Sequence, residues 1–482
     1  MAEQQWRIVK RSVDARQREL RVHLTILTDE QGKPIAKDAP IPLYEPPVFQ
    51  DVHNAERQVV IIGAGPAGLF AALTLLEHGI KPIIYERGKE VSERKKDIAL
   101  LNRNEGLNPE SNYCFGEGGA GTFSDGKLFS RSKKRGNMQR VMELFHYFGA
   151  PDTVLYEAHA HIGSDKLPGI IKKMRECILE HGGEIHFETK IESLSPFTSH
   201  LSPIILAIGH SAHDTYRMLA AEGVTLETKG FAMGVRAEHP QSLINKLMYH
   251  LDISKPRDLE VINYVGNASY SLVTQVDGRG VYSFCMCPGG HIVPAGSEAG
   301  SCVVNGMSAS HRNSPYANSG MVVQINPEDI SGKNLLRGLE FQEKLERLAF
   351  EHGGPQAQAP AQRLKDFVEG KPSKDLPACS YLPGTVSSRL DQWLPASIGK
   401  RLQQGFRDFD RKYPGFLTND AVILGVESRS SSAIRIPRDP ETLQSISTPN
   451  LYPCGEGAGY AGGITSSALD GINAALKIAQ FI

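Results

Sequence analysis

The chain has 482 residues, which is more than one hydrophobic core usually organises, so we expect two or three domains. Its composition, with 40% hydrophobic and 22% charged residues, is typical of an ordinary globular protein. A net charge of −1 and the lack of any membrane-length apolar run or signal-peptide core argue against a broad nucleic-acid surface and a membrane span, and favour a cytoplasmic protein.

We expect residues 1–56 to form a small N-terminal module with a proline-rich connector. Residues 20–27 alternate apolar and polar side chains, which is typical of a half-buried strand. Four prolines between Pro40 and Pro47 then predict an extended connector. The basic residues between Arg7 and Arg21 could contact a phosphate or a partner, but a solvated face is the simpler interpretation.

A buried strand runs directly into a glycine turn and a helix at residues 59–76. Val59 to Ile62 suit a central parallel strand, and the three glycines that follow have separate tasks. Gly63 permits the tight turn, Gly65 lets backbone approach a pyrophosphate, and Gly68 lets the helix pack closely on the strand. The helix N-terminus favours an anion, so the motif predicts dinucleotide binding.

The next strand supports the same prediction. Residues 82–85 are apolar and end at Glu86, 23 positions after Gly63. A carboxylate about 20 residues beyond the first glycine typically accepts hydrogen bonds from a ribose. Two other segments also match the glycine spacing, at residues 116–121 and 457–462, but neither has the complete strand, turn and helix around it.

The middle of the chain contains a glycine-rich loop at residues 116–127, which predicts backbone lying against something flat or anionic. An apolar strand at residues 203–208 ends in Gly209, as expected at the carboxyl edge of the same sheet. The basic run Arg131, Lys133, Lys134 and Arg135 could receive RNA or a charged substrate, but exposed loop charge is the simpler interpretation.

Residues 231–421 change to short strands, prolines and turns, which predicts a substrate or cap domain inserted into the first domain. The first domain would then comprise residues 57–230 and 422–482.

Seven scattered cysteines do not resemble a disulfide framework, and a reducing compartment fits them. Cys285 and Cys287 share one face if they lie in a strand, so two packed thiols are the simplest interpretation, with a redox or zinc motif disfavoured by their spacing. We expect no metal site.

The end of the chain indicates which class of dinucleotide the protein binds. We expect a glycine-rich turn at residues 455–464, nearly four hundred residues after Gly63, to complete the first domain from the far end, followed by a helix over residues 465–479. With residues 11–16, 116–127, 284–290, 303–308 and 427–429, these segments resemble the two-domain FAD-dependent oxidoreductases, and more closely the group called FAD-dependent dehydrogenases. The resemblance covers nearly the whole chain.

This resemblance implies an α/β fold: a Rossmann-like FAD-binding domain closed by the C-terminal segment, an inserted mixed α+β domain, and the small N-terminal module. It also implies non-covalent FAD, with a helix N-terminus directed at the pyrimidine ring, where reduced flavin carries negative charge. The residues implied to bind FAD are Gly63, Gly65, Pro66, Ala67, Gly68, Glu86, Arg87, Gly118, Gly119, Gly121, Thr122, Gly209, Gly455, Glu456, Gly462, Gly463 and Ile464.

Few residues are candidates for chemistry beside the flavin. Asp125 and Lys127 lie in the glycine-rich loop, Arg429 could clamp a substrate carboxylate, and Tyr460 lies in the terminal turn. Each also has a structural interpretation: a turn, a phosphate contact, a brace or packing. His291 follows a turn and is more simply structural.

The leading hypothesis is an oxidoreductase in which a small-molecule substrate, bound between the FAD domain and the inserted domain, exchanges hydride with flavin N5. No integral NAD(P)H domain is visible, so NAD(P)H would act as a transient reductant if it acts at all. Two alternatives stay open: a flavoprotein that modifies tRNA, and a non-catalytic flavin-binding sensor or scaffold. The sequence leaves the substrate, the direction of the reaction and the oligomeric state open.

Overall fold

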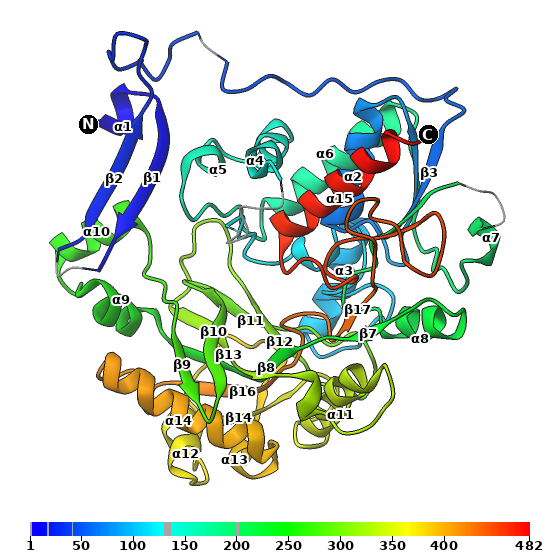
Figure 1. The fold of residues 1–482 in the computed structure, drawn as a ribbon. Helices are drawn as coiled ribbons and strands as arrows, with labels where there is room; N and C mark the ends of the chain where they lie inside the picture. Colours follow the sequence, from blue (N-terminus) through cyan, green and yellow to red (C-terminus); the bar gives the residue numbers. More distant parts are fainter. Residues whose placement is uncertain (1, 17–18, 41, 130–135, 199–201) are drawn as a thin grey trace.

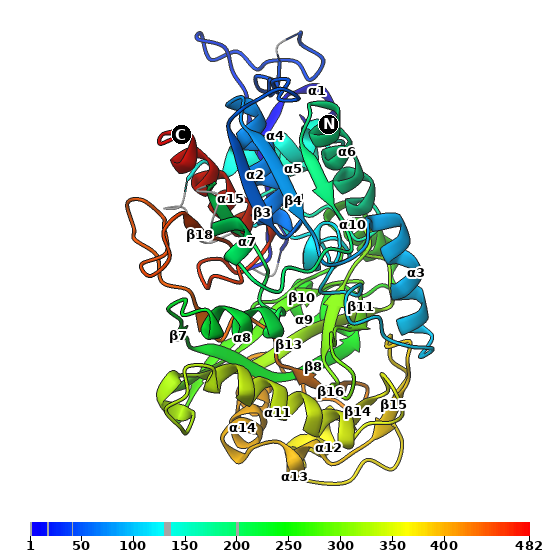
Figure 2. The same ribbon diagram turned by 90° about the vertical axis from the view of Figure 1, so that its right-hand side faces the viewer.

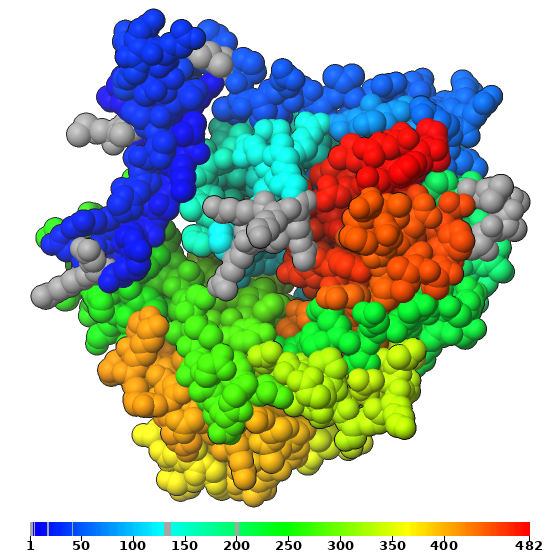
Figure 3. Space-filling model, viewed as in Figure 1, coloured from blue at the N-terminus to red at the C-terminus, as the bar shows by residue number. Residues whose placement is uncertain are grey.

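The computed structural model describes residues 2–16, 19–40, 42–129, 136–198 and 202–482. An antiparallel hairpin of β1 (Ile8–Asp14) and β2 (Arg21–Ile26) follows the short helix α1 (Ala2–Gln5). The predicted strand at residues 20–27 is therefore confirmed as β2, whereas β1 carries basic side chains that hide its alternation. Figure 1 shows the connector running as an extended chain from this hairpin to β3, and in Figure 3 the hairpin projects from the body of the molecule.

The first sheet is parallel and has five strands, in agreement with the predicted Rossmann-like fold. Its order is β18 (Leu451–Pro453), β6 (Ile204–Leu206), β3 (Gln58–Ile62), β4 (Lys81–Tyr85) and β5 (Glu184–His186). β18 comes from the end of the chain, so the C-terminal segment closes this sheet as predicted. The longer helices of this part are α2 (Pro66–Glu77), α4 (Met138–Tyr147), α6 (Leu167–Glu180) and α15 (Ile464–Ala479).

Helices α2 and α15 lie side by side in both ribbon views, although almost four hundred residues separate them (Figures 1 and 2). Glycine makes this closeness possible. A Cβ atom built on Gly471 of α15 would lie 2.0 Å from the carbonyl oxygen of Ala67 in α2. Apolar residues of α2, α4, α6 and α15 form one continuous core beneath the sheet. The last helix is thus an integral part of the first domain.

The second sheet is mixed and has seven strands. Its order is β15 (Thr385–Ser387), β14 (Ala359–Arg363), β16 (Val422–Glu427), β8 (Phe231–Pro240), β13 (Tyr316–Ile325), β10 (Arg279–Cys287) and β9 (Val273–Val276). β16 pairs with β8, so this sheet extends past the domain boundary predicted at residue 421. The helices of this part are α9 (Gln241–Tyr249), α10 (Pro256–Val265), α11 (Arg337–Glu351), α12 (Leu364–Glu369), α13 (Leu390–Trp393) and α14 (Ala396–Lys412).

The remaining described elements are α3 (Val91–Asn102), η1 (Gly119–Gly121), α5 (Thr153–Tyr156), α7 (Ser195–Thr198), α8 (His213–Ala221), β7 (Glu227–Thr228), β11 (His291–Pro294), β12 (Val304–Met307), η3 (Pro327–Asp329) and β17 (Ile434–Arg435). β11 pairs with β12, and β17 pairs with β7. Among the helices in the described parts of the chain, none combines the length and apolarity that crossing a membrane would need.

Candidate active site

Three glycine-rich segments meet above the carboxyl ends of the parallel strands. A Cβ atom built on Gly119 would lie 3.1 Å from the Cα of Gly65, and one built on Gly121 would lie 3.0 Å from Cγ1 of Ile464. The amide of Gly118 also donates to the carbonyl of Ala64 at 2.8 Å. The structure therefore brings together the first glycine turn, the glycine loop and the terminal turn. The sequence analysis assigned all three segments to the same cofactor.

Two helices begin at this meeting point without a capping side chain. The N-cap residues of α2 and α15 are Gly65 and Gly463, and neither helix has a side-chain cap hydrogen bond. In contrast, Glu90 caps α3 and Asn137 caps α4, each through its side chain. Uncapped N-termini leave donors and a positive dipole end for an anion.

Open backbone surrounds these helix ends. A Cβ atom built on Gly209, Gly462 or Gly463 would meet nothing within 4 Å, and one on Gly65 would find only the Cα of Gly119, at 3.9 Å. Pro66, which opens α2, contributes no amide of its own and fits the first helical position. This cradle of glycine backbone beside two uncapped helices fits a long cofactor with a pyrophosphate and a flat ring.

Glu86 accepts three hydrogen bonds from backbone amides. Its Oε2 accepts from the amide of Ala64 at 2.8 Å, and its Oε1 accepts from Gly88 at 2.9 Å and Gly116 at 3.0 Å. The buried carboxylate thus fixes the first turn against the glycine loop. Its contact with a ribose stays a prediction, since a carboxylate oxygen has room for a further donor.

Arg87 is held by acidic neighbours. It donates from Nε to Glu110 at 2.6 Å and from Nη1 and Nη2 to both oxygens of Asp214, at 2.9 and 2.8 Å. Its guanidinium also lies over the ring of Phe115, 4.1 Å from the centroid. Arg87 therefore acts as a structural brace, and an additional contact with adenosine stays a prediction.

The terminal turn is anchored by a residue that the sequence analysis missed. The amide of Gly455 donates to Oδ2 of Asp470 at 2.7 Å, and Arg438 donates to both oxygens of Asp470. Nearby, Oε1 of Glu456 lies 3.4 Å from Nδ1 of His210. In the glycine loop, the hydroxyl of Thr122 donates to the carbonyl of Glu117 at 2.9 Å. These contacts shape the cradle from within the protein.

A cavity lies where the first domain meets the second sheet. It has about 510 Å³ of space not filled by atoms, part of it open to solvent. Its walls come from both domains: Tyr113, Cys114, Ala120, Phe123, Ser124, His210 and Ser211 on one side, and Val293, Ala295, Val303, Val304, Asn305, Gly306, Glu427 and Arg429 on the other. It is the natural place for a substrate beside the cofactor cradle.

Arg429 lines this cavity, but the bidentate edge expected to clamp a substrate is already occupied. Its Nε and Nη2 donate to the two oxygens of buried Glu346 at 2.9 and 2.8 Å. Its Nη1 donates to the hydroxyl of Ser297 at 2.7 Å. A bidentate clamp is therefore ruled out in this arrangement, because the pairing with Glu346 compensates the buried charge.

Asp125 and Lys127 lie away from the cavity walls. Asp125 forms a two-pronged ion pair with Arg312 of the second domain, and Lys127 donates to the carbonyl of Met286. Burial alone would raise the pKa of Asp125, but Lys127 and Arg312 together lower it. An ionised, paired carboxylate is a poor proton donor, so these residues join the two domains.

Tyr460 and His291 also lie outside the cavity walls. The ring of Tyr460 packs against Arg438, at 4.0 Å from the centroid, and its hydroxyl accepts from the Arg438 amide. His291 is exposed at the start of β11. The structure gives both residues packing or surface positions. The basic run at residues 131–135 lies outside the described residues.

Glu427, at the end of β16, is the most informative residue that the sequence analysis did not propose for chemistry. It lines the cavity, is 1% exposed, and accepts from Nη1 of Arg236 at 3.0 Å. Burial raises its pKa to about 7, against the opposing effect of Arg236. The available signal was a single acidic residue closing the apolar run Val422 to Val426.

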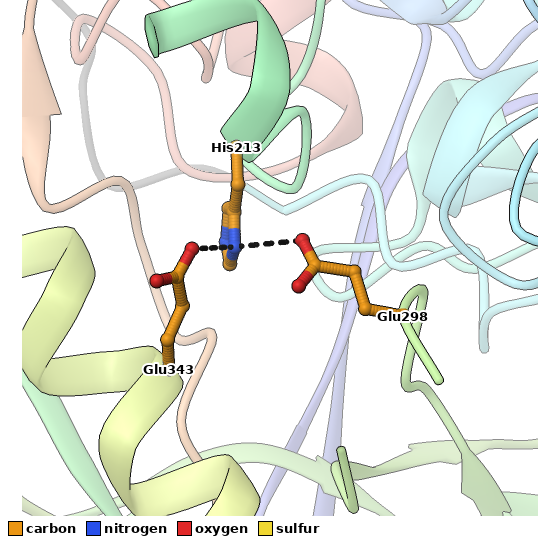
Figure 4. A group of neighbouring side chains, drawn as sticks. All are labelled: His213, Glu298 and Glu343. Carbon is orange, nitrogen blue, oxygen red and sulfur yellow. Dashed lines mark ion pairs between the residues drawn. The ribbon is translucent and has the colours of Figure 1, made fainter. Parts of the chain in front are cut away.

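A buried histidine joins the two domains beside the cavity. His213 of α8 points between Glu298 and Glu343, with Nδ1 3.3 and 3.1 Å from their Oε1 atoms (Figure 4). Burial and Arg429 would lower the pKa of His213, but the two glutamates raise it above its usual value. Arg217 of the same helix also pairs with Glu343. The cluster therefore holds α8 of the first domain against acidic side chains of the second domain.

Comparison with known proteins agrees with this site. A family model described as an FAD binding domain matches residues 56–206, and one described as a FAD-dependent protein, C-terminal domain-like, matches residues 230–430. A relative from Clostridium beijerinckii, described as an uncharacterized protein, is 40% identical over 498 residues, which cover 98% of this chain and 92% of the relative.

Three solved structures are similar at low identity. CtdE in complex with FAD and substrate 4 is 10% identical, covering 89% of this chain and 81% of that one, with a TM-score of 0.31. Halogenase PltM is 13% identical, covering 88% and 69%, with a TM-score of 0.35. Tetracycline destructase Tet(51) is 10% identical, covering 88% and 82%, with a TM-score of 0.32.

The family matches fall on the two domains of the fold in chain order, and the relative from Clostridium beijerinckii spans both. The FAD binding match begins just before the first glycine turn and includes the glycine loop. The chain therefore belongs to one family with this relative and combines an FAD binding domain with a region described as a FAD-dependent protein, C-terminal domain-like, with FAD as its cofactor.

Proposed function

We propose that this protein exchanges a hydride between N5 of bound FAD and a small organic substrate held in the cavity between the two domains. Bound FAD supplies the two-electron chemistry, so the chain needs only to position the substrate and handle a proton. The observation that carries the proposal is the cavity itself, which adjoins the cofactor cradle and has walls from both domains.

The cavity walls indicate a small substrate with an apolar body and a polar group. Phe123, Val293 and Val303 provide apolar surface, whereas Ser211 and Asn305 provide neutral polar groups. A few polar groups in an otherwise apolar pocket fix the orientation of a ligand. We infer that the polar end of the substrate faces Asn305 and Glu427, leaving its apolar part against the valines.

Glu427 is our candidate for the proton transfer. A carboxyl group whose pKa lies near neutral is able both to donate and to accept a proton at working pH. Arg236 fixes its position by a 3.0 Å hydrogen bond and is itself held by Asn318 at 2.8 Å. Glu427 is therefore held in place beside the substrate space and has a suitable pKa.

The test is anaerobic rapid mixing of the FAD-loaded protein with NADH, NADPH and a panel of small hydroxy acids. Reduction of the flavin band by one donor is the expected result. Glu427→Gln keeps the size and the hydrogen bond to Arg236 but removes the proton, and we expect reduction to slow by about a hundredfold or more. Glu328→Gln, at an exposed position, is the matched control and leaves the rate unchanged.

Two results would contradict the proposal. If every donor left the flavin band unchanged, the protein would not exchange hydride with these substrate classes. If Glu427→Gln reduced the flavin as fast as the parent protein, with the same dependence on pH, Glu427 would not transfer the proton.

A further inference from the structure

Cys285 and Cys287 lie at a break in β10, where the strand departs from regular pairing. Phe284 is opposite Gly320 of β13, and pairing resumes only at Cys287 opposite Asn318. Cys285 has φ of +45°, a left-handed conformation that is strained for a residue with a side chain. The pair is therefore not two thiols on one face of a regular strand, because a bulge repositions them.

The bulge sets both cysteine side chains at one point of β10. The thiol of Cys287 donates to the carbonyl oxygen of Cys285 at 3.3 Å. Cys287 is completely buried, whereas Cys285 is only half-buried. Cys285 is therefore the member of the pair that solvent reaches.

Cations surround the pair. Nη2 of Arg236 lies 3.6 Å from Sγ of Cys287, and Nζ of Lys127 lies 3.9 Å from the same atom. Lys127 has no carboxylate nearer than Asp125, whose Oδ2 is 3.8 Å away and already pairs with Arg312. Lys127 therefore shares its carboxylate partner Asp125 with Arg312.

The positively and negatively charged groups near Cys285 and Cys287 do not balance. The described cations are Arg236 of β8, Lys127 of the glycine loop and Arg312 after β12, and the described carboxylates are Asp125 and Glu427. His161 beside Asp125 has a pKa lowered by burial and by Arg312, so it is neutral. Three positive charges face at most two negative ones, and a thiolate would balance them.

The pKa values agree in direction with this count. The hydrogen bond from Cys287 lowers the pKa of Cys285, burial opposes this change, and Lys127 and Arg236 lower the pKa further. The pKa of Cys287 is raised, since it keeps its proton in that hydrogen bond and is buried. The lower pKa of the two thiols therefore belongs to Cys285.

We propose that Cys285 and Cys287 form a redox-active dithiol that reacts with low-molecular-weight disulfides. The Cys285 thiolate attacks one sulfur of the disulfide, forming a mixed disulfide and releasing a thiolate. Cys287 then loses its proton and attacks the sulfur of Cys285, which closes an internal disulfide and releases the second thiolate. The two cysteines are oxidised, the external disulfide is reduced to two thiols, and the proton of Cys287 leaves with the product.

The test uses the full-length protein with oxidised glutathione at pH 7, followed by alkylation and mass spectrometry. The peptide spanning residues 280–312 contains Cys285, Cys287 and Cys302. We expect it to lose the mass of two hydrogen atoms and to carry an alkyl group only on Cys302 once the protein is unfolded. Cys302 is an internal control, because burial raises its pKa to about 12.

Variants assign the two steps. Cys287→Ser stops the reaction at the mixed disulfide, so glutathione remains on Cys285, and Cys285→Ser leaves Cys287 unmodified. Lys127→Met removes a neighbouring cation and slows alkylation of Cys285 at pH 7 by about tenfold, because less thiolate is present. Cys379→Ser, at another half-buried cysteine, is the matched control and changes none of these results.

The proposal can be tested on the parent protein even if a variant fails to fold. If Cys285 and Cys287 are both alkylated after glutathione treatment as fully as before it, the dithiol is not redox-active. Alkylation of Cys285 no faster than that of Cys379 at pH 7 would equally overturn the proposal, since the thiolate would then be absent. Neither readout depends on flavin reduction.

Discussion

The two domains build their share of the site in opposite ways. The FAD-binding domain offers the cofactor open glycine backbone at Gly65, Gly209 and Gly463, together with two helix N-termini that have no capping side chain. The second domain instead places charged side chains in the cavity wall, with Glu427 paired to Arg236 and Arg429 paired to Glu346. A cofactor of fixed chemistry needs shape and donors, whereas a substrate side needs positioned charges in a dry environment.

The largest effect should come from breaking a buried ion pair of the second domain. Glu346→Ala leaves Arg429 charged and buried without its partner, and we expect a loss of about 3–5 kcal/mol in the free energy of unfolding. Urea unfolding measures it. Glu351→Ala on the exposed side of the same helix is the control, with little change expected. A loss below about 1 kcal/mol in Glu346→Ala would mean that Arg429 finds solvent or another partner.

Buried carboxyl groups should also give the second domain a pH response. Burial raises the pKa of Glu238 in the folded protein to about 7, although hydrogen bonds from Ser380 oppose the shift. The folded state keeps this proton while the unfolded state releases it near 4.5, so stability present at low pH is lost as pH rises to 7. Over that range we expect the stability difference between the parent protein and Glu238→Gln to change by up to about 3 kcal/mol.

Unfolding at a series of pH values checks this expectation. Glu369→Gln, whose carboxylate is exposed and pairs only with Lys371 at the surface, serves as the control. A constant difference between Glu238→Gln and the parent protein from pH 4.5 to 8 would show that Glu238 ionises normally.

On the cofactor side, adding one carbon atom should be enough to disturb the site. Gly68→Ala would place a Cβ atom 2.0 Å from the carbonyl oxygen of Gly63, so the turn must move. We expect a loss of about 1–3 kcal/mol in stability and much weaker FAD binding, measured by titration of flavin fluorescence. Gly169→Ala in α6 meets no atom within 4 Å and should bind FAD normally. Normal FAD affinity in Gly68→Ala would contradict the close packing.

The smallest effect on stability is expected where an exposed ion pair is removed, in contrast to the buried pairs of the second domain. Lys96 pairs with Glu93 one turn earlier on α3, and both side chains are exposed. Lys96→Ala should leave the free energy of unfolding nearly unchanged, since solvent screens such pairs. A clear loss of stability in Lys96→Ala would show that surface pairs contribute more in this protein than their exposure predicts.

The same contrast explains which features the sequence could predict. The strand from Val59 and the glycine turn after it follow from short local patterns, and both are present in the structure. The closure of the sheet by the C-terminal segment is a long-range pairing that was inferred with the family resemblance, and it is also present. Glycines have a fixed meaning wherever backbone must approach closely, so their spacing alone identifies the turn.

Partners that are distant in sequence were not predictable in this way. Arg429 was a candidate to clamp a substrate or to act as a brace, and nothing in its neighbourhood of the chain indicates its partner Glu346, 83 residues away. Asp125 was expected near the chemistry, yet its partner Arg312 lies 187 residues further on. The boundary at residue 421 failed to include β16 for the same reason, since pairing with β8 is a long-range interaction.

The position of β18 and α15 has a consequence for biosynthesis. The parallel sheet lacks its edge strand, and the cradle lacks one of its two helix ends, until residues 451–479 have left the ribosome. The complete cradle can therefore form only after residues 451–479 have been synthesised. Premature termination upstream of residue 451 would produce a fragment that lacks one edge strand of the sheet and one of the two helix ends that face the coenzyme.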